Sequence, residues 1–121
     1  MGRFVITRTK KPDGSNRYCF FAEGRGAEIL GESDEYKSSD SVRKAIESIR
    51  KNSQIADTDR QTNPLFEIRE ERKKYYYILK SRNGRSLLKG KKCSSRRAAE
   101  IRISELQQMA PKAAVIMPGR R

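Results

Sequence analysis

Lysines and arginines gather in the second half of the chain, in runs suited to holding phosphate groups. Residues 1–60 hold 12 Lys/Arg against 10 Asp/Glu, whereas residues 61–121 hold 16 against 5. A solvated surface normally mixes the two signs, so this imbalance predicts nucleic acid or another polyanion as the partner, with solubility as the alternative. The candidate contact residues are Arg72, Lys73, Lys74, Lys80, Arg82, Arg85, Lys89, Lys91, Lys92, Arg96 and Arg97.

Two of these cations, Arg96 and Arg97, fall in the first turn of an expected helix. The helix dipole is positive there and disfavours cations, and a bound anion would offset that cost. Arg82 and Arg85 flank an Asn-Gly pair, so they would project on a turn and could enter a groove. On a duplex, contacts to the phosphate backbone would dominate and sequence readout would be minor.

Residue types that carry catalysis are poorly represented. The chain has no histidine, so acid-base chemistry would fall to groups such as the paired acids Glu70 and Glu71, which sit among cations and suit a solvated surface. Cys19 and Cys93 lack a neighbouring base, and no metal-ligand spacing is present. We therefore expect a protein that is not an enzyme and uses no cofactor, metal or small-molecule substrate.

The elements that would position the cations follow from hydrophobic patterning. Ser38 or Ser39 is a suitable N-cap for a first helix that ends at Asn52-Ser53, and a second helix begins near Ser94-Ser95. The apolar positions at helical spacing are Val42, Ala45, Ile46 and Ile49, then Ala98, Ala99, Ile103 and Leu106. Strands are predicted at Phe4–Thr7, Arg17–Ala22, Glu28–Leu30, Phe66–Ile68, Tyr75–Leu79 and Ser86–Leu88, with one more at Ala113–Ile116.

The two halves of the chain follow one plan. A shift of 57 residues carries Tyr18 to Tyr75 and Ser38 to Ser95, and the one change of offset falls in the first hairpin loop. This predicts an α+β chain of two tandem β-β-β-α repeats that share one compact domain. The boundaries are 1–56 for the first repeat, 57–64 for a linker, 65–117 for the basic second repeat and 118–121 for a flexible tail.

Each half resembles the small repeat of the YegP-like family, whose function is unknown. The matching stretches are FVI, RYCFFAEGRGAEIL, EYKSS and VRKAIESIRKN, then FEI, YYYILKSRNGRSLL, KCSS and AAEIRISELQQ. Cys93, where an aromatic residue is expected, and Gly26-Ala27, where Asn-Gly is expected, depart from the pattern. The resemblance implies one antiparallel sheet with two helices packed on one face, and it implies no activity.

Strand alternation divides the expected sheet into two faces. The face toward the helices should hold Tyr18, Phe20, Ala22, Tyr75, Tyr77 and Leu79, joined by Phe4, Ile6, Phe66, Ile68, Leu30 and Leu87. The other face would expose Phe21, Tyr76 and Ile78, and Val5, Ile29 and Leu88 could join them. An exposed apolar face predicts a homodimer or another protein interface first, and a platform for stacking bases second.

The sequence contains no apolar run long enough to span a bilayer and no secretory leader. Its two cysteines are too few for a disulfide framework. We therefore expect a cytoplasmic protein that does not bind membranes.

Overall fold

The computed structural model describes residues 2–58, 66–81 and 84–116, and in these ranges the chain forms seven strands and two helices. The strands are β1 (Arg3–Lys10), β2 (Asn16–Glu23), β3 (Ile29–Glu32), β4 (Phe66–Glu71), β5 (Lys74–Lys80), β6 (Ser86–Lys89) and β7 (Ala114–Ile116). The helices are α1 (Ser39–Thr58) and α2 (Arg96–Met109), and a short 3-10 turn, η1, covers Arg25–Ala27. The predicted strands and helices are present, and the α+β class is confirmed.

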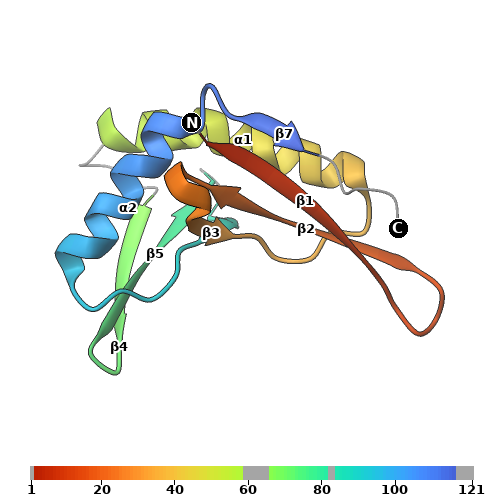
Figure 1. Ribbon diagram of the computed structural model, residues 1–121, viewed down its shortest axis with the longest axis horizontal. Coiled ribbons are helices and arrows are strands. Elements are labelled where there is room, and N and C mark those ends of the chain that lie inside the picture. Colours follow the sequence, from red (N-terminus) through yellow and green to blue (C-terminus); the bar gives the residue numbers. More distant parts are fainter. Residues whose placement is uncertain (1, 59–65, 82–83, 117–121) are drawn as a thin grey trace.

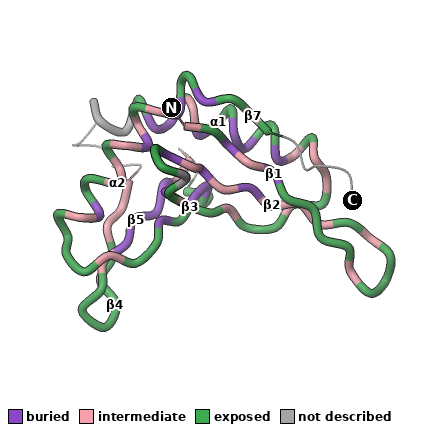
Figure 2. Tube along the Cα trace, in the orientation of Figure 1, coloured by how far each residue is buried: buried purple, intermediate pink, exposed green. Residues whose placement is uncertain are grey.

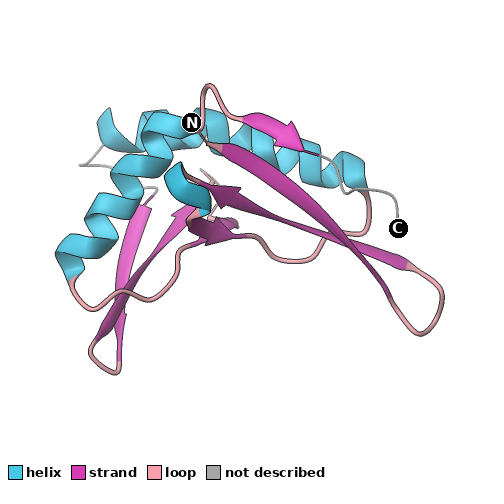
Figure 3. Cartoon of the chain, in the orientation of Figure 1, coloured by secondary structure: helices cyan, strands magenta, loops and turns pink. Residues whose placement is uncertain are grey.

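The strands form one sheet in the order β4-β5-β6-β3-β2-β1-β7, with both helices on the same side of it (Figures 1 and 3). The prediction of a wholly antiparallel sheet was wrong, because β7 pairs with β1 in parallel. A Cβ added to Gly2 would lie 2.8 Å from Met109 Cβ, so α2 ends where β1 begins. The chain therefore leaves α2 and runs along β1 in the same direction.

Helix α1 is longer than the sequence predicted. Ser38 begins it as expected, since its Oγ accepts a hydrogen bond of 3.1 Å from the amide of Ser41. Asn52 and Ser53 were expected to end it, yet the helix continues to Thr58. Both side chains are buried and bond inside the helix, Asn52 to the carbonyl of Ser48 at 2.7 Å and Ser53 to that of Arg50 at 3.3 Å. Polar side chains satisfied in this way do not break a helix.

The core lies between the sheet and the helices, where Figure 2 shows the buried segments. The predicted members Phe4, Ile6, Phe20, Ala22, Leu30, Tyr77, Leu79 and Leu87 are buried in it, and Tyr18, Phe66 and Ile68 pack against it. Leu88 was predicted for the opposite face but is also in the core. The register of β5 with β6 shifts between Leu79 and Lys80, so an irregularity turns both leucines inward.

Backbone contacts recur at a spacing of 57 residues. Tyr18 and Tyr36 exchange backbone hydrogen bonds of 2.8 and 2.7 Å, and Tyr75 and Cys93 exchange bonds of 2.8 and 2.6 Å. Two more pairs of backbone hydrogen bonds show the same spacing. The amide of Gly24 bonds to Glu28 as that of Ser81 bonds to Arg85. The amide of Val42 bonds to Ser38 as that of Ala99 bonds to Ser95. Equivalent local structures therefore stand in the two halves of the sheet.

Candidate nucleic-acid interface

The β4–β5 hairpin reverses through only two residues, Arg72 and Lys73. Both have a left-handed backbone, with φ of 52° and 65°. Two-residue hairpin turns with positive φ at both positions favour Asn-Gly, because most side chains are strained there. Both residues are exposed, and neither forms an ion pair with another residue in the described ranges. The turn thus presents two free cations on an unfavourable backbone.

The loop of residues 90–95 holds two more cations against this hairpin. Cys93 pairs with Tyr75 through two backbone hydrogen bonds, and Lys92 Nζ lies 2.8 Å from the carboxylate of Glu71. The bond to Lys92 lowers the pKa of the Glu71 carboxyl. Lys91 is exposed beside it. In Figure 1 the loop crosses the hairpin on its way to α2, which begins at the same end of the molecule.

Helix α2 adds Arg96 and Arg97 to this end. The Ser95 side chain caps the helix by accepting a hydrogen bond of 3.1 Å from the amide of Ala98. The first turn of α2 contains no acid, so the two arginines add their charge to the positive end of the helix dipole. Arg96 Nε lies 3.7 Å from Glu100, an exposed pair of small energetic value.

Seven cations from three segments therefore gather at one end of the molecule, and we call this set the basic tip. Its members are Arg72, Lys73, Lys74, Lys91, Lys92, Arg96 and Arg97. The acids nearest to them along these segments are Glu70, Glu71 and Glu100, of which the last two pair with Lys92 and Arg96. The other five cations are exposed and have no ion-pair partner in the part of the chain that the structure describes.

The other predicted cations that the structure describes lie outside the basic tip. Lys80 Nζ is 2.7 Å from Glu67, which also pairs with Arg69. Arg85 follows the other end of β5, near Tyr36, whose pKa is raised by burial and then by Asp34, with the Arg85 charge opposing them. Arg82 lies outside the described residues. Of the expected groove-entering pair, Arg85 is therefore separate from the basic tip.

The outer sheet face does not expose the apolar patch that alternation predicted. Tyr76 and Ile78 do point away from the core, but only 8% and 7% of their surface is exposed. Lys89 Nζ lies 4.9 Å from the centroid of the Tyr76 ring, and Arg69 stands opposite Tyr76 across the strands. Long cationic side chains thus cover this face with their stems. Phe21 is half-buried, so little apolar area is left for the predicted dimer interface or stacking platform.

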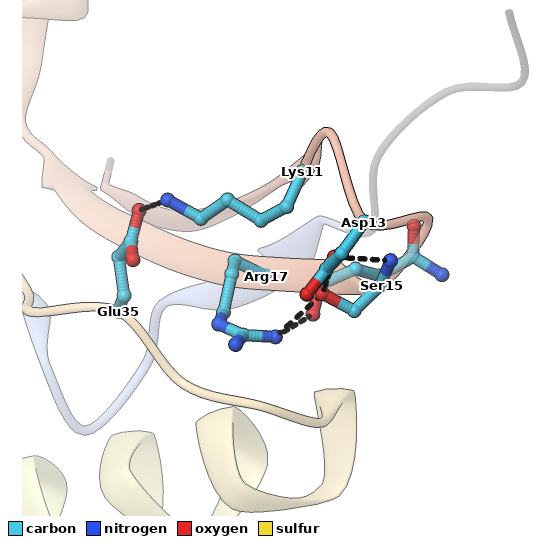
Figure 4. A network of polar contacts seen from close by, with 6 residues as sticks. Lys11, Asp13, Ser15, Arg17 and Glu35 are labelled. Carbon is cyan, nitrogen blue, oxygen red and sulfur yellow. Dashed lines mark hydrogen bonds and ion pairs between the residues drawn. The ribbon is translucent and has the colours of Figure 1, made fainter.

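The corresponding end of the first half carries balanced charge (Figure 4). Lys11 Nζ pairs with Glu35 at 3.2 Å, and Asp13 accepts hydrogen bonds from the amide and hydroxyl of Ser15 at 2.9 and 2.6 Å. These Ser15 bonds lower the pKa of Asp13. Arg17 donates to the Ser15 hydroxyl at 3.1 Å. Acids on the hairpin and on the facing loop thus stand among the cations at this end, whereas the facing loop at the basic tip carries Lys91 and Lys92.

A hollow of about 540 Å³ lies away from the basic tip, between the start of β1, the β2–β3 connection and the end of α2. Leu30 and Met109 line it together with Arg25, Glu105 and Lys112, so its charges are mixed. Among the described residues, no three His, Cys, Asp or Glu side chains are placed to share a metal ion. The described helices include none with the length and apolar character to cross a membrane.

Comparison with known proteins establishes the family. A family model described as a domain of unknown function (DUF1508) matches residues 25–59. A UPF0339 protein of Pseudomonas aeruginosa is 30% identical over 105 residues, which is 86% of this chain and 87% of that protein. The chain belongs to the UPF0339 family.

Two solved structures share the fold. The solution structure of a UPF0339 protein from Shewanella oneidensis covers 96% of this chain and 90% of its own, with a TM-score of 0.77 and 18% identity. The solution structure of YegP from E. coli covers 99% and 96%, with a TM-score of 0.77 and 22% identity. The YegP-like resemblance predicted from sequence is therefore confirmed. YegP is itself described as a protein of unknown function, so the comparisons carry the fold and no activity.

Proposed function

We propose that this UPF0339 protein binds nucleic acid through the basic tip, by contacts to the phosphate backbone and without catalysing a reaction. Support comes from the five exposed cations that lack ion-pair partners within the described ranges. Cations of this kind can neutralise phosphates and so release the counterions condensed on the nucleic acid, which is the dominant sequence-independent term in such binding. We also propose a cytoplasmic location, supported by the free thiols of Cys19 and Cys93.

The observation that carries the proposal is a reversal of charge at equivalent positions. The loop that pairs with β2 presents Asp34 and Glu35, whereas the loop that pairs with β5 presents Lys91 and Lys92 at the positions 57 residues later. The backbone around them is the same in both halves, so the fold does not require cations there. A role in solubility alone would not favour cations at these two positions over the acids that stand at their counterparts.

The salt dependence of binding to a short DNA duplex tests the proposal. Each phosphate neutralised should contribute about 0.9 to the slope of log K against log salt, so five contacts predict a slope of about −4 to −5. The double variant Lys91→Asp/Arg97→Glu should reduce the magnitude of this slope by about 2 or more. The thermal midpoint should hold or rise, since an acid at the start of α2 suits the dipole.

A matched control makes the same change in net charge elsewhere. Arg43 and Lys51 are exposed on α1, and the variant Arg43→Asp/Lys51→Glu should leave the salt slope nearly unchanged. If both variants weaken binding equally, net charge rather than the basic tip is responsible. If the parent protein shows no salt-dependent binding to DNA or RNA, the proposed function is wrong.

We further infer that the two halves are copies of one β-β-β-α unit. The recurrent backbone bonds support this, and so do two edge-on aromatic pairs. Phe4 and Phe20 have ring centroids 6.2 Å apart, and Phe66 and Tyr77 have centroids 5.7 Å apart. These pairs hold the same positions on the first and second strands of each half. Duplication followed by divergence explains such a match between distant segments.

One pair of substitutions tests this duplication. Tyr36 stacks on Phe20 in the first half, and its counterpart is Cys93. Arg102 forms an ion pair with Glu28, and its pKa is raised mainly by Glu28 and also by Cys93, while its counterpart in α1 is the small Ala45. The double variant Cys93→Tyr/Arg102→Ala should therefore be more stable than the sum of its single variants predicts. Strict additivity of the two changes in unfolding free energy would count against equivalence.

A further inference from the structure

The β4–β5 hairpin has the form of a narrow projecting ribbon. In Figure 1 it extends past the start of α2, and Figure 2 shows its turn as exposed. The ribbon is two strands wide and ends in the two-residue turn of Arg72 and Lys73. Glu71, the acid next to the turn, is neutralised by Lys92. The end of the ribbon is thus slim and cationic.

The cations of the basic tip stand at two levels along this ribbon. Cys93 of the loop pairs with Tyr75, and Gly90 donates a backbone hydrogen bond to Tyr77, so the lysines between them lie two to four residues from Lys73 along the ribbon. With a rise of about 3.4 Å per strand residue, the turn reaches about 7–14 Å beyond Lys91 and Lys92. The major groove of B-form DNA is about 8.5 Å deep and about 12 Å wide, and it admits a two-stranded ribbon. A duplex could therefore touch both levels together.

Other nucleic acids fit this surface less well. Proteins that bind single strands stack bases on exposed aromatic rings. Tyr75 and Tyr76 are the aromatic residues on β5 nearest the basic tip, and they are half-buried and buried, the latter under Lys89. The major groove of A-form RNA is deep and too narrow for such a ribbon. The arrangement favours B-form DNA over both.

Resting on the proposed function, we propose that the partner is double-stranded DNA and that the β4–β5 turn enters its major groove. Arg72 and Lys73 lie at the base edges, where guanine offers the O6 and N7 acceptors. Lys91 and Arg97 hold the phosphates at the rim. This role explains why Arg72 and Lys73 occupy a left-handed turn that Asn-Gly would suit better, since Asn-Gly would place no cation there.

Fluorescence anisotropy tests this with three labelled probes of one sequence: a DNA duplex, an RNA duplex and a DNA single strand. The measurements run between about 50 and 200 mM salt, where phosphate contacts dominate. The DNA duplex should bind at least about tenfold more tightly than either alternative. The variant Arg72→Gln/Lys73→Gln should weaken duplex DNA binding by about tenfold or more and the other two by much less.

The control variant Arg43→Gln/Lys51→Gln removes two charges from α1 and should change none of the three affinities appreciably. Equal or tighter binding of the single strand or the RNA duplex would overturn this inference and leave the proposed function standing. An unchanged duplex affinity in Arg72→Gln/Lys73→Gln would also overturn it. Absence of salt-dependent binding to all three probes would overturn both.

Discussion

Replacing the β4–β5 turn by Asn-Gly should stabilise the protein while it weakens nucleic-acid binding. Arg72 and Lys73 hold φ of 52° and 65°, and a left-handed backbone costs an ordinary residue about 1 kcal/mol or more. Arg72→Asn/Lys73→Gly removes roughly 2 kcal/mol of this strain, and the added freedom of glycine in the unfolded chain offsets about 0.5–1 kcal/mol. The net gain in unfolding free energy should be about 1 kcal/mol, or about 4 °C in thermal midpoint.

Urea denaturation measures this gain as a higher midpoint at an unchanged slope. The variant Arg72→Gln/Lys73→Gln is the matched control, because it removes the same charges but keeps side chains on the left-handed backbone. Its stability should stay within about 0.5 kcal/mol of the parent. A comparable gain in both variants would show that relief of charge repulsion, not backbone strain, is responsible. No gain in the Asn-Gly variant would refute the strain argument.

Two further predictions concern stability. Arg50 donates hydrogen bonds of 3.3 and 3.0 Å to two carbonyls just before β7, so Arg50→Met should cost about 2 kcal/mol and speed amide exchange in β7. Glu67 has its pKa lowered to about 2 by hydrogen bonds from Arg69 and then Lys80. Because this pKa is lower in the folded protein than its value of about 4.5 in the unfolded chain, the ionised carboxylate stabilises the fold above pH 4.5, and this stability is lost as the pH falls toward 2. The urea midpoint of Glu67→Gln should therefore change less than that of the parent protein between pH 4.5 and 2.

Local patterning was sufficient for the elements and most of the core. Val42, Ala45, Ile46 and Ile49 were predicted from spacing alone, and all four are buried. The helix end at Asn52-Ser53 was predicted wrongly, because propensity cannot show that a polar side chain will bond within its own helix. The cations of the basic tip were all among the predicted residues. The sequence could not show that Lys80, Arg85 and Lys89 lie apart from the basic tip, because their positions depend on how the strands pair.

The left-handed turn at Arg72 and Lys73 carried no turn signal, since it contains no Gly, Asn or Pro. The only indication available was the strand pattern on both sides of it. The sequence also could not predict that Lys89 covers Tyr76, because the two residues lie on different strands. Alternation gives the face on which a side chain lies, and only the neighbouring strands decide whether that face is open to solvent.

By itself, the sequence determined the kinds of element and the excess of positive charge in the second half. These properties are local, since they follow from spacing along the chain and from composition. The tertiary structure alone decided that β7 runs parallel to β1, that the loop of residues 90–95 joins the β4–β5 hairpin, and that five cations there lack partners within the described ranges. Those properties depend on contacts between segments distant in sequence, where pairing of charge is settled by geometry and not by count.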